Sequence, residues 1–496
     1  MPGAAARSLL KTVHWTVFRA RRAPLKPLRA EPTLNQFGKK NDKGSFPSAL
    51  DLRRNIKIMR ADGRQPDEKR PVKIDTDFVR TAYGSCLIAT GNTRVICTAS
   101  VEETVPPFLK GKGKGWVTAE YAMLPASTTE RKKRDGIKKD GRGVEIQRLI
   151  GRALRQAVDL TKLGERTITL DCDVLEADGG TRTASITGAM VALTCAIDRL
   201  VREKKLLISP IIHQVAAISA GIVDDVPCLD LCYQEDSRAQ VDMNFVMNEK
   251  GEFIELQGTG EGRAFSGSEL DALMSHGRKG ISELMAAQRE ALGERTAQIA
   301  PKPLLLAATG NEHKLKELQE MFRDYYTLAP MSDAGFFGPI DENASTFAGN
   351  AAIKAEAVCE ATGLPAIADD SGLEVDALDG EPGVLSARYA GEHGNDEANN
   401  DLLLSRMEGR KDRSAAFRCA LALKIPGKDT LIAEGKCPGT ILYERRGTGG
   451  FGYDPLFLYE PMGKTYAEMN EQEKNGISHR ARAAEKMREI MKEIQH

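Results

Sequence analysis

The sequence carries two groups of residues whose types and spacing suit phosphate chemistry. In the first, Gly179-Gly180-Thr181-Arg182 stands where a β-rich run ends and an apolar helical pattern begins. Glycines let the backbone approach an anion closely, the first N–H groups of a helix point toward it, and a guanidinium matches two phosphate oxygens. The segment predicts a phosphate-binding turn, and a plain strand-to-helix turn with a solvated arginine fits it equally well.

Carboxylates and cations accompany this turn in the same half of the chain. Asp236 and Asp242 stand six positions apart, and such a pair can hold Mg²⁺ or supply a general acid beside a phosphodiester. A basic run upstream could attract a polyanion as a mobile loop. It consists of Arg131, Lys132, Lys133, Arg134, Lys138, Lys139 and Arg142. An acidic turn on a sheet rim and a solvated loop are the structural alternatives.

The second group begins directly after the apolar run 304–308. It consists of Thr309, Gly310, Asn311, Glu312, His313 and Lys314. A strand, a glycine turn, a helix start and a lysine together form a phosphate cradle. The segment lacks the ending of a P-loop, which disfavours that class of nucleotide-binding protein. A generic strand-to-helix turn is the alternative.

Acidic and aromatic residues complete the second group. Asp369-Asp370 follow an apolar strand start, and paired aspartates at a strand end suit Mg²⁺ and the orientation of a water. Asp341 and Glu342 could complete the metal shell, whereas acids on a solvated turn are the alternative. A glycine-rich loop, 447–455, contains Phe451, which could stack on a base.

The elements that must position these residues follow from apolar spacing and turn signals. We expect β-rich runs over 72–100, helices over 145–158, 186–201 and 268–293, and strands over 167–174 and 304–308. Ser268 is the expected N-cap of the third helix. Residues 296–303 end in two prolines spaced two apart, which favours an extended linker.

The zero net charge of the 496-residue chain is composite. Residues 1–58 carry 13 Lys and Arg against 3 Asp and Glu, net +10; residues 59–300 carry 34 against 35, net −1; residues 301–496 carry 23 against 32, net −9. As a whole-chain average, neutrality excludes a polybasic nucleic-acid coat and an acidic disordered chain. We therefore expect an N-terminal extension over 1–58, domains over 59–295 and 304–496, and a linker over 296–303.

The basic extension resembles a mitochondrial targeting segment in composition, but we expect an untargeted, disordered extension, and targeting is the alternative. Met59 could be the true start. No apolar run approaches the ~20 residues that cross a bilayer, so we expect no membrane span. Nine cysteines without a CxxC pair fit core residues in a reducing cytosol, and we expect a cytoplasmic protein.

Longer strings in the first domain resemble ribonuclease PH along residues 59–294. They are Met59-Arg-Ala-Asp-Gly-Arg64, Gly115-Trp-Val-Thr-Ala-Glu-Tyr-Ala-Met-Leu-Pro125, Glu145-Ile-Gln-Arg-Leu-Ile-Gly-Arg152, Ala177-Asp-Gly-Gly-Thr-Arg-Thr183, Glu235-Asp-Ser, Val241-Asp-Met-Asn244 and Leu256-Gln-Gly-Thr-Gly260. Several long strings in order are more specific than any single motif.

This resemblance implies a phosphate-dependent 3′→5′ exoribonuclease that trims tRNA precursors and other RNA 3′ ends and releases nucleoside diphosphates. It implies a ribonuclease PH-like βαβ fold, similar to domain 2 of ribosomal protein S5, in a hexameric ring. Carried over by position, Arg142, Gly180, Thr181 and Arg182 would bind the attacking inorganic phosphate. Asp236 and Asp242 would hold Mg²⁺ or protonate the leaving 3′ oxygen, and the run from Arg131 to Arg134 would guide RNA.

The second domain is similar to the inosine/xanthosine triphosphate pyrophosphatase family over about residues 304–494. The matching strings are Thr309-Gly-Asn311 with Lys314, Ala368-Asp-Asp-Ser-Gly-Leu-Glu-Val-Asp376, Pro382-Gly383 with Ser386-Ala-Arg-Tyr-Ala-Gly391, Gly449-Gly-Phe-Gly-Tyr-Asp-Pro455 and Ser478-His-Arg480. This implies an elongated mixed α/β domain that dimerises and uses Mg²⁺ to hydrolyse ITP, dITP or XTP to monophosphate and pyrophosphate.

By position in that family, Asp370 would be the base and a metal ligand, helped by Glu342 or Asp341. The segment from Thr309 to Lys314, Ser371 and Lys474 would hold phosphate or sugar. The base pocket would be lined by Phe451, Gly452, Tyr453, Asp454, His479 and Arg480.

The fold class is therefore two domains, α/β and α+β, each with its own enzyme activity. The alternative is an RNA-binding scaffold with a silent nuclease site, fused to a general nucleotide pyrophosphatase. The two resemblances imply assemblies of different symmetry, a hexameric ring and a dimer.

Overall fold

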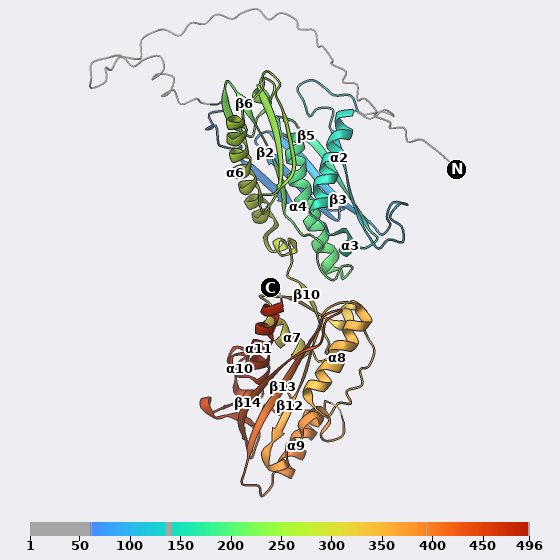
Figure 1. The fold of residues 1–496 in the computed structure, drawn as a ribbon, viewed down its shortest axis with the longest axis vertical. Coiled ribbons are helices and arrows are strands. Elements are labelled where there is room, and N and C mark those ends of the chain that lie inside the picture. Colours follow the sequence, from blue (N-terminus) through green and yellow to red (C-terminus); the bar gives the residue numbers. More distant parts are fainter. Residues whose placement is uncertain (1–59, 61, 135–140, 393, 495–496) are drawn as a thin grey trace, which may run out of the picture. The chain divides into compact units, whose positions relative to one another are not determined.

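The structure is a computed structural model that describes residues 60, 62–134, 141–392 and 394–494 (Figure 1). Residues 1–58, Met59 and two lysines of the basic run, Lys138 and Lys139, lie outside the described residues.

Two sheets form the first half of the described chain. A five-stranded sheet has the order β1-β2-β3-β5-β4, in which β4 and β5 pair in parallel, and a four-stranded antiparallel sheet has the order β7-β6-β8-β9. The strands are β1 (Val72–Thr76), β2 (Gly84–Thr90), β3 (Thr93–Glu102), β4 (Trp116–Met123), β5 (Thr167–Glu176), β6 (Val215–Val223), β7 (Val226–Leu229), β8 (Val241–Asn248) and β9 (Phe253–Thr259).

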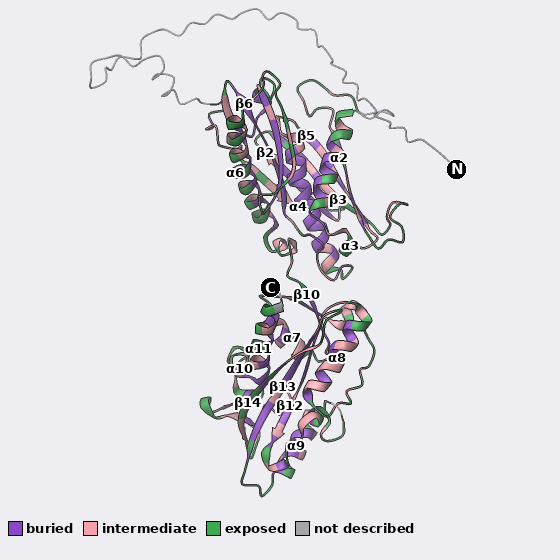
Figure 2. Ribbon diagram, viewed as in Figure 1, coloured by how far each residue is buried: buried purple, intermediate pink, exposed green. Residues whose placement is uncertain are grey.

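Five α-helices accompany these sheets: α2 (Gly141–Gln156), α3 (Leu160–Leu163), α4 (Thr181–Arg202), α5 (Tyr233–Asp236) and α6 (Gly267–Leu292). α4 packs against β2 and β3 of one sheet and β6 of the other, and it is largely buried (Figure 2). A Cβ on Gly84 of β2 would stand 2.2 Å from the carbonyl oxygen of Ala192. Only glycine therefore lets β2 approach the backbone of α4 this closely.

α4 also corrects one expectation about apolar runs. It is 22 residues long with a mean hydropathy of 1.4 over an 18-residue window, so the prediction that no segment reaches membrane-spanning length and apolarity is wrong. Inside the structure 89% of that window is buried. Its apolar side chains are accounted for by the core between the two sheets.

The predicted helices and strands are present with shifted ends. α6 is capped by Ser266 rather than Ser268, because Ser266 and Glu269 form a capping box in which each side chain bonds the other's backbone N–H. The start of the predicted linker is not extended, since a 3-10 helix covers Gly293–Gln298. All nine cysteines are free and buried, as expected of core residues.

A seven-stranded sheet organises the second half, in the order β11-β10-β12-β13-β14-β15-β16. Its strands are β10 (Leu304–Ala307), β11 (Thr327–Pro330), β12 (Ala366–Val375), β13 (Ser414–Lys424), β14 (Leu431–Ile441), β15 (Phe457–Tyr459) and β16 (Lys464–Thr465). The α-helices are α7 (Glu312–Phe322), α8 (Phe347–Thr362), α9 (Asp396–Arg406), α10 (Glu471–Ile477) and α11 (His479–Ile494). α7 and α11 bury one face of the sheet, and α8 buries the other.

Asp369 and Asp370 lie inside β12, not at a strand end, because β12 continues to pair with β13 as far as Val375. Successive residues of a strand point to opposite faces. Ile367 faces α7 and α11, whereas Ala366 and Ala368 face α8. Asp369 therefore points toward α11 and Asp370 toward α8, so the two carboxylates serve different sites.

We expect Gly84→Ala to destabilise the first half by on the order of 2–3 kcal/mol, because the new methyl group must displace the backbone of α4. Differential scanning calorimetry should show the corresponding transition at lower temperature. Gly267→Ala is the matched control, since nothing lies within 4 Å of its Cβ position. Equal transition temperatures for Gly84→Ala and the unaltered chain would contradict this packing.

Candidate active sites

The first site is built on the N-terminus of α4. Gly180 is the N-cap residue with φ of 67° and makes no side-chain cap, so the first N–H groups of a 22-residue helix are left to a ligand. Thr181 Oγ1 accepts a hydrogen bond from the Tyr121 hydroxyl at 2.9 Å. Arg182 donates to Gln257 Oε1 at 3.1 Å and lies 3.7 Å from Glu145. The turn thus combines N–H donors, a helix dipole and a guanidinium, as a phosphate site requires.

The two predicted acids, Asp236 and Asp242, lie close enough to the arginines of this site for the positive charges to lower their pKa values. Burial and the charge of the neighbouring Asp236 together raise the pKa of Asp242 to about 6, against the opposing effect of Arg182 and Arg142. Burial also raises the pKa of Asp236, and Arg142 and Arg182 again oppose the shift. The structure therefore brings Arg142, Arg182, Asp236 and Asp242 together in one site.

The predicted RNA-guiding run borders this site. Lys132, Lys133, Arg134 and Arg142 line a cavity of about 430 Å³ together with Tyr121, while Arg131 is exposed beside it. Arg142 belongs both to this cavity and to the site that contains Asp236 and Asp242.

Sequence reasoning missed two residues of the first site. Tyr121 bonds Thr181, and burial raises its pKa while Arg142 and Arg182 oppose the shift. Glu261 adds negative charge near both acids. Tyr121 lies within one of the strings that match ribonuclease PH, which was the available signal for it.

The second half contains a buried ion network around Asp369. Lys314 Nζ lies 2.5 Å and Arg480 Nε 2.8 Å from its carboxylate, and Ser371 Oγ donates to it at 3.0 Å. Burial alone would raise the pKa of Asp369, but Arg480 and Lys314 hold it well below its usual range. Arg480 also pairs with Glu317. Lys314 and Arg480, both predicted to contact nucleotide, are thus held by Asp369.

Asp370 belongs to a separate cluster on the α8 side of the sheet. Lys354 Nζ lies 3.2 Å from Asp370 Oδ1 and 2.9 Å from Glu342 Oε2, and Asn350 donates to Asp370 at 3.2 Å. Burial raises the pKa of Asp370, and the charge of Lys354 opposes the shift. Glu342 rather than Asp341 joins this cluster, because the side chain of Asp341 is exposed. Sequence reasoning missed Lys354, a lone lysine inside the apolar pattern of α8.

The carboxylates of Asp370 and Glu342 could serve as two ligands of a divalent cation that takes its remaining ligands from a bound substrate. Mg²⁺ in such enzymes takes one or two carboxylates plus substrate phosphate oxygens. Among the residues that the structure describes, no group of three or more His, Cys, Asp or Glu side chains is placed to hold a metal alone. Asp370 with Glu342, and Asp236 with Asp242, therefore suit Mg²⁺ bound together with a substrate.

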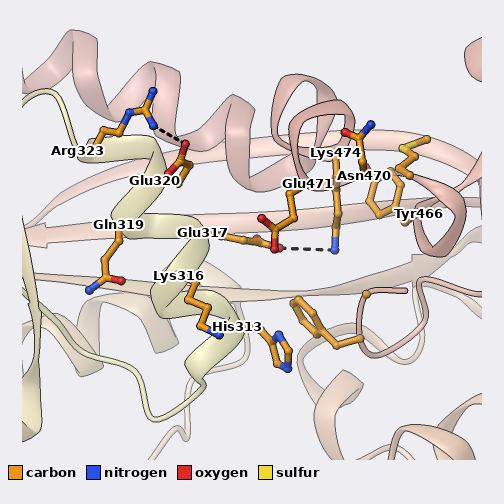
Figure 3. A pocket seen from close by; sticks show the side chains of 13 residues that line it. His313, Lys316, Glu317, Gln319, Glu320, Arg323, Tyr466, Asn470, Glu471 and Lys474 are labelled. Carbon is orange, nitrogen blue, oxygen red and sulfur yellow. Dashed lines mark hydrogen bonds and ion pairs between the residues drawn. The ribbon is translucent and has the colours of Figure 1, made fainter. Parts of the chain in front are cut away.

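A cavity of about 630 Å³ lies between α7, α10 and the glycine-rich loop (Figure 3). His313 stacks on Phe451 with 5.6 Å between ring centroids and 22° between planes. Lys474 Nζ lies 4.7 Å from the Phe451 ring and 2.6 Å from Asp454. Glu317 and Lys474 point toward one another in the close-up, 3.6 Å apart. An aromatic face beside a cation suits a nucleotide base with its phosphate or sugar.

Other predicted nucleotide ligands have structural partners. The Tyr453 hydroxyl donates to the carbonyl of Ser386 at 2.9 Å, and Gly452 N donates to Asp396 at 2.6 Å. Asn311 caps α7 by accepting from His313 N and Lys314 N, so it occupies N–H groups that were predicted to hold phosphate. Thr309 accepts from Asn311 N, while Gly310 and Glu312 are exposed. Nucleotide contact by these residues stays a prediction.

His479 is buried beside this site and keeps an unused polar atom. Its ring stacks on Phe417 at 4.8 Å, and within the described part of the chain Nδ1 has no hydrogen-bond partner. Burial, reinforced by Arg480, holds the pKa of His479 well below its usual range, so the ring is neutral. A neutral imidazole with a free nitrogen suits recognition of a purine edge.

Each half of the chain matches a known protein family. The 3′ exoribonuclease family matches with its domain 1 over residues 68–197 and its domain 2 over 213–280, and the Ham1 family matches over 305–490. A ribonuclease PH of Bacillus velezensis is 56% identical over 244 residues, which are 49% of this chain and 100% of that relative.

Two solved structures resemble the second half. The Ham1 protein of Staphylococcus aureus is 38% identical with a TM-score of 0.36, covering 38% of this chain and 98% of its own. A nucleoside-triphosphatase, dITP/XTP pyrophosphatase, of Mycobacterium abscessus is 40% identical with a TM-score of 0.33, covering 37% of this chain and 98% of its own.

The family matches, together with the full-length match to a ribonuclease PH, show that this chain belongs to the 3′ exoribonuclease family over its first half and to the Ham1 family over its second.

Proposed function

We propose that the chain is a bifunctional enzyme: a phosphate-dependent 3′→5′ exoribonuclease joined to a pyrophosphatase for non-standard purine triphosphates. The observation that carries the first activity is the meeting of an uncapped helix N-terminus, two arginines and two carboxylates at one site. An RNA-binding scaffold has no chemical need of that combination.

In the first site, inorganic phosphate binds the N–H groups of α4 with Arg142 and Arg182. One of its oxygens attacks the phosphorus of the last RNA phosphodiester, and the bond to the 3′ oxygen of the preceding nucleotide breaks. That oxygen takes a proton and becomes the new 3′ hydroxyl, while the terminal residue leaves as a nucleoside diphosphate. With its pKa raised to about 6, Asp242 is suited to deliver this proton.

In the second site, a purine base stacks on Phe451, and Lys474 and His479 contact its sugar and edge. Asp370 accepts a proton from the attacking water, because burial raises its pKa toward that of an effective base. The water oxygen bonds to the α-phosphorus, the bond from that phosphorus to the oxygen that bridges to the β-phosphate breaks, and the products are a monophosphate and pyrophosphate. Discrimination for ITP, dITP or XTP requires donors aimed at O6 and no acceptor for an exocyclic amine.

Magnesium suits both reactions, where it would neutralise developing phosphate charge. Asp236 would hold it in the first site, joined by Asp242 when Asp242 is ionised, and Asp370 and Glu342 would hold it in the second. The trimming of tRNA precursors, a ring-shaped homo-oligomer, dimerisation through the second half and a cytoplasmic location are parts of the same proposal, and they rest on the family resemblance.

Asp242→Asn should abolish phosphorolysis while RNA still binds, and it should also stabilise the first half. The folded state keeps Asp242 protonated up to about pH 6, whereas the unfolded chain ionises near pH 4, so folding is penalised as pH rises through this window. Removing the charge should restore on the order of 1–3 kcal/mol at pH 7, and the gain should vanish toward pH 4.

Calorimetry at pH 4 and pH 7 and release of nucleoside diphosphate from RNA measure both effects. Asp271→Asn, at an exposed position on α6, is the matched control and should change neither. Unchanged turnover in Asp242→Asn would refute its catalytic role.

For the second activity, Asp370→Asn should lower ITP hydrolysis by about 100-fold or more, because the base is lost. Glu342→Gln should reduce the rate more than Asp341→Asn, since only Glu342 shares Lys354 with Asp370. Pyrophosphate release from ITP and ATP measures these rates, with Asp429→Asn, at an exposed turn, as the control. Full ITP turnover by Asp370→Asn would overturn the assignment, and equal rates on ITP and ATP would indicate a general pyrophosphatase.

A further inference from the structure

The turn that is proposed to bind phosphate and the turn that carries Asp236 touch through their backbones. A Cβ on Gly179 would stand 2.6 Å from the carbonyl oxygen of Leu231 and 2.8 Å from the carbonyl carbon of Cys232. Gly179 has φ of 75°. Because there is no room for a side chain between the two turns, their separation is sensitive to whatever holds them together.

Asp178 makes the side-chain link between the two turns. Its Oδ1 accepts a hydrogen bond from Tyr233 N, the first residue of α5, at 3.1 Å. α5 is a single turn that ends at Asp236, whose N–H donates to the carbonyl of Cys232 at 2.8 Å. The carboxylate of Asp178 thus fixes one end of the helical turn whose other end carries Asp236.

The β2–β3 hairpin holds Asp178 in turn. Asn92 Nδ2 donates to Asp178 Oδ2 at 3.2 Å. Thr93 Oγ1 accepts from Asp178 N at 2.9 Å and donates to the carbonyl of Gly179 at 2.7 Å. Both carboxylate oxygens and the adjacent backbone therefore have fixed partners, so the side chain has little freedom to move away from Tyr233.

Two buried arginines, Arg70 and Arg60, also bond to the segments that form these two turns. Arg70 forms a bidentate ion pair with Asp230, with Nη2 and Nε at 2.6 and 3.0 Å from its carboxylate, and also donates to the carbonyl of Asp178. Arg60 holds Glu235, the neighbour of Asp236, through two bonds of 2.5 and 2.7 Å. These pairs are buried, so they form a rigid base under the link.

We propose that Asp178 is a positioning residue of the nuclease, an inference that rests on the proposed function of this site. By holding α5 against the glycine turn, Asp178 sets the separation between the bound phosphate and the Asp236–Asp242 pair. Its two carboxylate oxygens accept from Tyr233 N and Asn92, so it acts through α5 and not on the phosphate directly. Its contribution is therefore expressed in the rate of the chemical step and not in phosphate affinity.

The test uses the full chain and compares Asp178→Ala, Asp178→Asn and Asn92→Ala. Asp178→Ala should lower kcat for phosphorolysis of a single-stranded oligonucleotide by on the order of 10–100-fold, because a small misplacement of reacting groups costs this much. Asp178→Asn keeps an oxygen that can accept from Tyr233 N and should stay within about fivefold of the unaltered rate. Asn92→Ala, at an exposed position, loosens one oxygen only and should fall between the unaltered chain and Asp178→Ala.

Titration calorimetry with inorganic phosphate distinguishes a positioning role of Asp178 from general damage to the phosphate-binding turn. Its Kd should change less than about threefold in all three variants, because the N–H groups of α4, Arg142 and Arg182 are untouched. Asp271→Ala, an exposed acid on α6, is the control for charge removal and should match the unaltered chain.

A normal kcat in Asp178→Ala, or a loss of phosphate affinity large enough to account for the whole loss of rate, would overturn the inference. If Asp178→Ala unfolds at a lower temperature, the test uses the rates of the exposed Asn92→Ala and the near-isosteric Asp178→Asn instead. A rate in Asn92→Ala equal to that of the unaltered chain would refute the inference. Absence of phosphorolysis in the unaltered chain would instead refute the proposed function itself.

Discussion

Charges that leave water must be paired, and this requirement determines where the acids of both sites stand. An unpaired buried carboxylate or guanidinium costs several kcal/mol, so each is held by a partner of fixed geometry. In the first half Arg60 and Arg70 pair with Glu235 and Asp230. In the second half Arg480 and Lys314 pair with Asp369. Asp242 and Asp370 lie outside these two networks, and burial raises the pKa of both.

The two halves reach this division by different routes. Strand geometry separates the adjacent Asp369 and Asp370, because one residue of β12 faces α11 and the next faces α8. Asp369 is held by Arg480 and Lys314, and Asp370 is the carboxylate that we propose for catalysis. In the first half the division falls within a single helical turn, where Glu235 is held by Arg60 and Asp236 faces the phosphate site. In each pair the ion-paired acid fixes the backbone that carries the acid proposed to act in catalysis.

Much of this architecture could be predicted from the sequence, because turns and helix starts are local features. The turn at Gly180 and the helix behind it follow from neighbouring residues, and so does the strand at 304. What could not be predicted depends on residues far apart in the chain. Lys354 reads as a lone lysine in an apolar helix until β12 brings Asp370 beside it, and Tyr121 reaches Thr181 from 60 positions away. The predicted N-cap of α6, Ser268, lies two residues beyond the observed one, because both serines are suitable and Ser266 alone forms a capping box with Glu269.

A crossed assay on one set of preparations distinguishes two independent active sites in one chain from a single shared site. Release of nucleoside diphosphate from RNA with inorganic phosphate, and of pyrophosphate from ITP, are measured for the unaltered chain, Asp242→Asn and Asp370→Asn. We expect both activities in the unaltered chain, loss of phosphorolysis alone in Asp242→Asn and loss of ITP hydrolysis alone in Asp370→Asn. Absence of either activity from the unaltered chain, or loss of both from one substitution in a folded protein, would refute the presence of two independent active sites.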